Sequence, residues 1–151
     1  MTDLTERTVE HATFVIERTY AAPPAHVFAL WASREAKNRW FGMPDEGGYT
    51  LDFRVGGKES NRGGPPGGPI YSYDAEYHEI VPDQRIVYGY TMDAGADRIS
   101  VSVTTVEFAV TGGGTRLTLT EQGVYLDGHD TAAIREKGTG ELLDGLGTAL
   151  G

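Results

Sequence analysis

The chain has 151 residues, the usual size of one domain, and its 39% apolar and 23% charged residues are typical of a globular protein. A net charge of −9 disfavours the phosphates of nucleic acids and the surface of anionic membranes, so we expect neither as a partner. The absence of cysteine excludes disulfides and thiolate sites. The acid-bearing N-terminal segment lacks the pattern of a signal peptide, so we expect a cytoplasmic protein.

The first part of the chain is expected to contain one strand and two short helices. Residues 1–12 should form a flexible tail before a single domain that covers residues 13–151. From Thr13 to Tyr20, β-branched and aromatic residues alternate with polar ones, which predicts a strand. Pro24 then suits the first position of a helix, because proline presets φ and lacks only an N–H that is unpaired there anyway. The inward stripes of the two helices are Val27, Phe28, Leu30 and Trp31, then Ala36, Trp40 and Phe41.

The middle of the chain has the period-two pattern of strands. The expected strands are Tyr49–Val55, Ile70–Ile80, Arg85–Met92, Ile99–Val110 and Thr115–Gly123. Residues 61–69 are rich in glycine and proline and are expected to form a loop. Because short connections join successive strands, the sheet should be antiparallel.

The last segment, Asp130 to Leu150, returns to helical spacing, with Asp130 as the expected cap. Its apolar stripe should consist of Ile134, Gly138, Leu142, Leu146 and Leu150. A strand, two short helices, a run of strands and one long helix predict an α+β domain with helices on one face of a sheet.

Gly138 is the first indication of a cavity. Glycine costs about 1 kcal/mol relative to alanine inside a helix, and this one lies on the apolar stripe itself. The missing side chain indicates either close packing of the helix on the sheet or room left for a ligand. The sequence leaves both readings open.

The expected inner face of the sheet favours the cavity. If the hairpin around Gly113 closes symmetrically, Thr104 and Glu121 lie opposite each other on the inner side, among tyrosines of the neighbouring strands. An inward carboxylate among aromatic residues is typical of an apolar pocket with a few orienting polar groups. Alternatively, tyrosine is simply a good strand residue, and Glu121 pairs with an arginine. The cavity candidates are Trp31, Trp40, Tyr73, Tyr77, Tyr90, Met92, Thr104, Val106, Phe108, Leu119, Glu121, Gly138 and Leu142.

Other kinds of site are not indicated. The four histidines are far apart, and Asp127 to Asp130 reads as a turn before a helix, so we expect no metal site and no cofactor. There is no nucleophile elbow and no phosphate-binding glycine motif. Acid–base chemistry by Glu121 with Tyr73 or Tyr77 is conceivable if burial shifts their pKa values.

Several stretches together resemble a known superfamily. Glu17 to Pro24 followed by Val27-Phe28 resembles the opening of the SRPBCC (START/pollen-allergen-like) superfamily, and specifically of its branch named after the activator of heat-shock protein 90 ATPase. Asp52, Arg54, Gly56 and Gly57 match the Asp-x-Arg-x-Gly-Gly motif of that branch, for which we expect a structural role. Residues 80–87 resemble its proline hairpin, and residues 114–123 resemble its late strand. One departure is Thr139, which stands where the branch often has tryptophan.

The resemblance implies a helix-grip fold, in which a curved antiparallel sheet wraps around a long C-terminal helix and leaves a cavity between them. Our leading hypothesis is a binding protein, monomeric or homodimeric, for a small apolar or amphipathic ligand, without obligatory catalysis. An alternative is an enzyme of the cyclase, dehydratase or hydrolase type that uses Glu121 and a cavity tyrosine. A co-chaperone module that regulates a chaperone ATPase is the third and weakest hypothesis.

Overall fold

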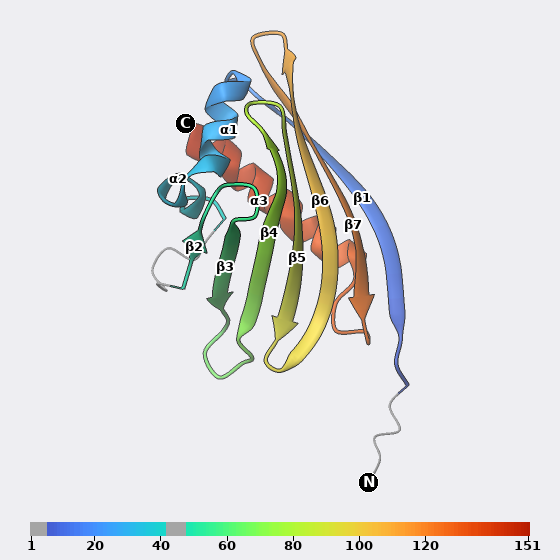
Figure 1. The fold of residues 1–151 in the computed structure, drawn as a ribbon. Helices are drawn as coiled ribbons and strands as arrows, with labels where there is room; N and C mark the ends of the chain where they lie inside the picture. The colour runs from blue at the N-terminus through green and yellow to red at the C-terminus, as the bar shows by residue number, and fades with distance from the viewer. Residues whose placement is uncertain (1–5, 42–47) are drawn as a thin grey trace.

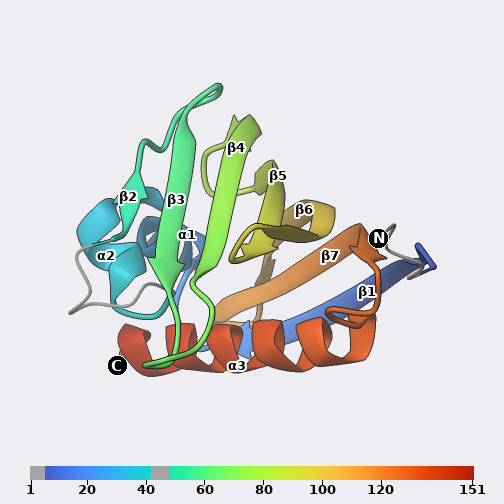
Figure 2. The same ribbon diagram turned by 90° about the horizontal axis from the view of Figure 1, so that it is seen from below.

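A computed structural model of the chain describes residues 6–41 and 48–151. The elements are β1 (Val9–Tyr20), α1 (Pro24–Ala32), α2 (Arg34–Asn38), β2 (Thr50–Leu51), β3 (Lys58–Gly63), β4 (Tyr71–Val81), β5 (Arg85–Ala94), β6 (Asp97–Thr111), β7 (Gly114–Leu126) and α3 (Ala132–Leu150). The described strands form one sheet in the order β1-β7-β6-β5-β4-β3-β2, and all neighbours are antiparallel. The sheet curves around α3, which runs along its concave side (Figure 1, Figure 2). This is the expected α+β helix-grip architecture.

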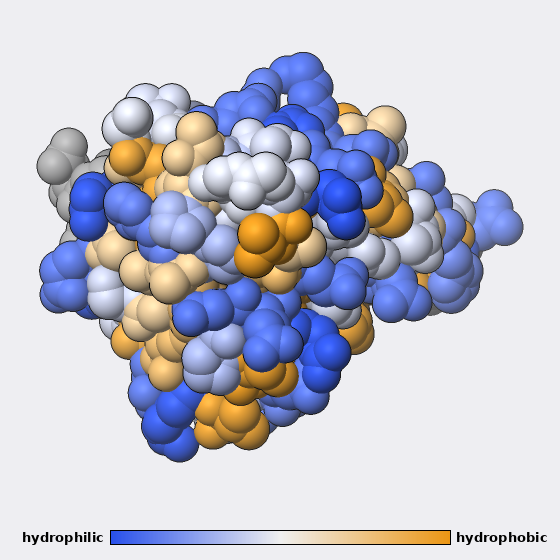
Figure 3. Space-filling view, turned by 90° about the horizontal axis from the view of Figure 1, so that it is seen from above, coloured by the Kyte–Doolittle hydropathy of each residue, from blue (hydrophilic) through white to orange (hydrophobic). Residues whose placement is uncertain are grey.

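None of the helices within residues 6–41 and 48–151 is long and apolar enough to cross a membrane. Figure 3 views the end of the molecule that carries the β4–β5 and β6–β7 turns, where apolar residues are interspersed with hydrophilic ones.

The β6–β7 hairpin has the register that its symmetric closure predicts. Thr104 lies opposite Glu121, and the pairs Val106–Leu119 and Phe108–Leu117 continue along the same side. All six side chains are buried. A carboxylate is thereby built into the concave, otherwise mostly apolar face of the sheet.

Helix α3 lies closer to β1 than to any other strand. Two of its glycines permit this approach: a Cβ added at Gly147 would lie 3.2 Å from the ring of Tyr20, and one added at Gly140 would lie 3.0 Å from the guanidinium of Arg18. The Tyr20 hydroxyl also donates a 2.8 Å hydrogen bond to the carbonyl oxygen of Leu143. Because the helix is held at this edge, it does not fill the whole concavity.

The strand boundaries differ from expectation in two places. Strand β1 begins at Val9 rather than Thr13, because residues 9–12 continue the pairing with β7. The expected tail of residues 1–12 is therefore too long, and its residues 1–5 lie outside the described residues. The expected strand Tyr49–Val55 is reduced to Thr50–Leu51, and the expected loop 61–69 begins only after Gly63. The missed strand β3, Lys58–Gly63, is polar and has little strand propensity of its own, but it pairs with β4 along its whole length.

Two expectations for α3 also need correction. The cap is Thr131, whose hydroxyl accepts a 3.2 Å hydrogen bond from the backbone N–H of Ile134, and not Asp130. The expected stripe does not stay on one face, because a spacing of four residues advances about 40° beyond each full turn. Ile134 is consequently 64% exposed, whereas Leu143 and Leu146 are buried.

Candidate functional site

A cavity of about 310 Å³ lies between the N-terminal half of α3 and the strands on the side of the sheet away from β1. Its apolar lining consists of Phe41, Tyr73, Tyr88, Tyr90, Met92, Ile134, Gly138 and Leu142. Its polar lining consists of Asn61, Glu121, Asp130, Arg135 and Thr139. A Cβ added at Gly138 would meet no atom within 4 Å, so this glycine faces open space.

The aromatic wall of the cavity is made of rings in mutual contact. The ring centroids of Phe41 and Tyr73 are 5.1 Å apart, and those of Tyr73 and Tyr90 are 4.9 Å apart. Both distances fall in the range of favourable aromatic pairs. Side chains that fix one another in this way give a ligand a preformed apolar surface.

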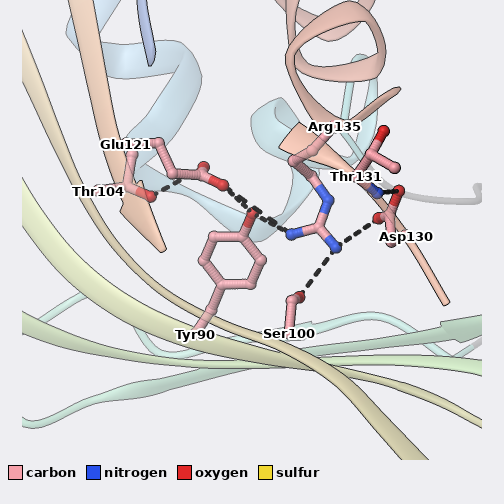
Figure 4. A network of polar contacts seen from close by, with 7 residues as sticks. All are labelled: Tyr90, Ser100, Thr104, Glu121, Asp130, Thr131 and Arg135. Atoms are coloured by element: carbon pink, nitrogen blue, oxygen red, sulfur yellow. Dashed lines mark hydrogen bonds and ion pairs between the residues drawn. The ribbon is translucent and has the colours of Figure 1, made fainter. Parts of the chain in front are cut away.

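The polar end of the cavity is a hydrogen-bonded network around Glu121 and Arg135 (Figure 4). Oε2 of Glu121 accepts a 2.7 Å hydrogen bond from the Tyr90 hydroxyl, and Oε1 accepts one of 3.1 Å from Thr104. Nη1 of Arg135 donates to the same Tyr90 hydroxyl at 2.8 Å and lies 3.9 Å from Oε2 of Glu121. Its Nη2 donates to Ser100 at 2.9 Å and to Asp130 at 2.8 Å. The network ties α3 to β5, β6 and β7.

Burial changes the acid–base properties of this network. The residue Glu121 is only 2% exposed, and loss of solvent raises the pKa of its carboxyl above the usual value, although the hydrogen bonds from Tyr90 and Thr104 and the charge of Arg135 act in the opposite direction. The pKa of Tyr90 is also raised, first by burial and then by the adjacent Glu121 carboxylate. Tyr90 therefore remains a protonated hydrogen-bond donor at neutral pH.

A second buried polar cluster lies behind the aromatic wall. Nζ of Lys37 is 2.8 Å from Oε2 of Glu59, and neither side chain is exposed. The hydroxyls of Tyr49 and Tyr77 donate to the same carboxylate at 2.6 and 2.7 Å. Lys37 Nζ also lies 4.3 Å from the ring centroid of Phe41, a cation–π distance. Burial lowers the pKa of Lys37, and the neighbouring Glu59 opposes the change. The cluster supports the cavity wall from behind.

Residues 21–151 match the protein family described as "Activator of Hsp90 ATPase homolog 1-like protein". The chain belongs to this family. Its fold is similar to that of a protein from Rhizobium leguminosarum, with 47% identity, a TM-score of 0.91 and coverage of 97% of this chain and 98% of the other. A protein from Rhizobium loti is also 47% identical, with a TM-score of 0.90 and coverage of 94% and 99%. A Chromobacterium violaceum protein at 23% identity, with a TM-score of 0.76 and coverage of 91% and 96%, shares the fold. No protein of curated function matches the sequence.

The Asp-x-Arg-x-Gly-Gly motif forms the turn between β2 and β3. Gly56 has a φ of +82°, which favours glycine, and its N–H donates to the Tyr77 carbonyl at 2.8 Å. The Tyr77 N–H returns a 3.0 Å bond to the carbonyl of Gly57. The exposed side chains of Asp52 and Arg54 pair with each other at 2.9 Å, so the motif stands outside the cavity.

The structure brings some of the expected cavity residues together and places others in the solid core. Those at the cavity are Tyr73, Tyr90, Met92, Glu121, Gly138 and Leu142. Those in the core behind it are Trp31, Trp40, Tyr77, Thr104, Val106, Phe108 and Leu119. The tyrosine bonded to Glu121 is Tyr90, whereas Tyr73 and Tyr77 direct their hydroxyls to Glu59 at 3.5 and 2.7 Å.

Sequence reasoning missed Arg135, Lys37 and Glu59. Arg135 precedes Gly138 by three residues and Leu142 by seven, so helical spacing alone places all three on one face. This helical spacing is the signal in the sequence that could have placed Arg135 at the cavity. Lys37 and Glu59 carried no comparable signal, because isolated charged residues are usually solvent-exposed. Within the described residues, no group of histidines and carboxylates is arranged to hold a metal ion.

Proposed function

We propose that the protein binds a small, largely apolar molecule in the cavity between α3 and the sheet. The observation that carries this proposal is Gly138, which faces open space in the middle of a helix. A helix that served only to complete a core would be more stable with a larger side chain there, by the helix propensity and by the apolar surface buried.

The size and lining of the cavity support a small ligand. Its volume of about 310 Å³ is at the lower end of the range of roughly 300–1,000 Å³ that is usual for small-molecule sites. Mostly apolar walls with polar groups concentrated around Glu121 suit an amphipathic molecule, whose apolar part would contact the rings of Tyr73 and Tyr90.

A cavity-filling variant tests the proposal. Screening by native mass spectrometry and thermal shift against small lipophilic and aromatic compounds should find ligands for the wild-type protein. Gly138→Leu should abolish their binding without unfolding the protein, because leucine favours the helix and would enter the cavity. Ala133→Leu adds a leucine at an exposed position of the same helix and should leave binding unchanged. Ligands that bound Gly138→Leu as tightly as the wild type would contradict the proposal.

The second candidate is acid–base catalysis in the same cavity. It is favoured by one observation, the buried Glu121 with its raised pKa beside the Tyr90 hydroxyl. Both oxygens of this carboxylate already accept hydrogen bonds, as they would in a structural network, so we place binding first. A compound converted to product by the wild type and not by Glu121→Gln would reverse this order.

We do not base a co-chaperone function on the family description. A fold can serve many functions, and functional conclusions come from the site. Failure of the chain to change the ATPase rate of an Hsp90 chaperone would agree with this view.

A further inference from the structure

We infer that the ligand's polar end is uncharged and donates a hydrogen bond, as a phenol or alcohol does, and that the cavity discriminates against carboxylates and phosphates. This inference rests on the proposed function. It follows from the hydrogen bonds and ion pairs that the charged and polar residues at the polar end of the cavity already make with one another.

Among the described residues that line the cavity, Arg135 is the only cation, and its guanidinium already has partners within the protein. Its two terminal nitrogens donate to Tyr90, Ser100 and Asp130. Its guanidinium carbon also lies 5.6 Å from the ring centroid of Tyr90 and 5.3 Å from that of Tyr125. These bonds use three of the five N–H groups of the guanidinium, and the Asp130 carboxylate already balances its charge. A ligand carboxylate at Arg135 would therefore be a third carboxylate, with Glu121 and Asp130, around one cation.

The charge balance of the lining also opposes an anion. Two carboxylates, Glu121 and Asp130, face the single guanidinium of Arg135. Their side chains are 3% and 14% exposed, so water screens this excess negative charge poorly. An anionic ligand that entered the cavity would lose its hydration and be repelled by these carboxylates, and both effects weaken binding.

Acceptors, in contrast, remain available to a donor. A carboxylate has about four acceptor positions, and the hydrogen bonds from Tyr90 and Thr104 to Glu121 use two of them. The neighbouring Ser102 hydroxyl takes at most one more, so an acceptor position remains. Across the cavity, Oδ1 of Asn61 is buried and has no hydrogen-bond partner among the described residues. A hydroxyl on the ligand would satisfy either acceptor.

A ligand cation is a weaker fit than a neutral donor. It would approach Glu121 next to Arg135, whose positive charge lies 3.9 Å from the same carboxylate. A neutral hydroxyl gains the hydrogen bond without this repulsion and with a smaller cost of desolvation.

The test uses ligands that share one ring system and differ in the polar group: 2-naphthol, 2-naphthoate, 2-naphthylmethylammonium and 2-methoxynaphthalene. Binding is measured at neutral pH by calorimetry or ligand fluorescence. We expect 2-naphthol to bind about tenfold tighter than 2-methoxynaphthalene, which lacks the donor, and at least about tenfold tighter than the anion. The ammonium compound should also bind more weakly than 2-naphthol.

The outcomes separate this inference from the proposed function. If all four compounds bind but 2-naphthoate or the ammonium compound binds as tightly as 2-naphthol, the inference is wrong and the binding function stands. If none binds the wild type, both fail. Glu121→Gln should raise the affinity for 2-naphthoate relative to 2-naphthol by about tenfold, because it removes a negative charge and keeps the side-chain size. An unchanged ratio in a folded Glu121→Gln variant would also overturn the inference. The comparison with 2-methoxynaphthalene requires no variant.

Discussion

The hydroxyl of Tyr90 donates a 2.7 Å hydrogen bond to Oε2 of Glu121, although the two residues lie on β5 and β7, with β6 between them. In the sheet register, Tyr90 is paired with Ser102 and Glu121 with Thr104. The tyrosine therefore reaches diagonally across β6 to the carboxylate. This contact connects the aromatic wall of the cavity to its polar end.

We expect Glu121→Gln to change how stability depends on pH. The pKa of Glu121 is raised in the folded protein above its ordinary value of 4.5, chiefly by burial, so the folded state holds this proton more tightly than the unfolded state does. The stability that Glu121 contributes is thus present in full below pH 4.5 and is lost as pH rises through the folded-state pKa. The free energy of unfolding of the wild type minus that of Glu121→Gln should fall from acid to neutral pH. Urea unfolding at several pH values measures this difference in free energy. A difference that rises with pH would contradict a raised pKa for Glu121 in the folded protein.

Removal of the Tyr90 hydroxyl should destabilise the protein. Tyr90→Phe keeps the ring but leaves Oε2 of Glu121 without its donor and Nη1 of Arg135 without its acceptor. A buried group left unsatisfied costs about 1–3 kcal/mol, and we expect a loss of unfolding free energy of this size. The exposed Tyr71 provides the control, since Tyr71→Phe should change stability little. Equal effects of the two substitutions in chemical denaturation would argue against the network.

Much of the fold could be predicted from the sequence because its signals are local. The glycines of the β6–β7 turn fix the hairpin register, and the register alone places Glu121 on the inner face opposite Thr104. Gly138 indicated the cavity because a glycine on an apolar stripe conflicts with helix propensity.

The partners of these residues could not be predicted in the same way. Arg135 reaches Tyr90 only because α3 lies along β1, and that position depends on the contacts of Tyr20 and Arg18 with the helix. These contacts join residues more than 100 positions apart. A periodic pattern within one element contains no information about them.

The buried ion pair of Lys37 and Glu59 should be sensitive to loss of one partner. Lys37→Met removes the cation and leaves the unexposed Glu59 carboxylate with tyrosine donors alone, so we expect a loss of about 3–5 kcal/mol in unfolding free energy. The double variant Lys37→Met with Glu59→Gln should recover a large part of this loss, because no unpaired charge remains.

The exposed pair of Lys137 and Glu141 is the matched control for this experiment. Its atoms also lie 2.8 Å apart, but the side chains are 77% and 65% exposed. Lys137→Met should therefore change stability very little. If the double variant at Lys37 and Glu59 were no more stable than Lys37→Met alone, the charge would not be the cause of the loss.

Two glycines of α3 should respond oppositely to alanine. At Gly138 the added methyl group meets nothing within 4 Å, so Gly138→Ala should stabilise the protein by about 0.5–1 kcal/mol through helix propensity. At Gly147 the methyl group would lie 3.2 Å from the ring of Tyr20, and this ring cannot move freely because its hydroxyl is bonded to the Leu143 carbonyl. In Gly147→Ala, the free energy gained from helix propensity should therefore be offset or exceeded by the cost of displacing Tyr20. Thermal unfolding of both variants measures the contrast, and equal stabilisation would show that α3 is not held tightly against β1.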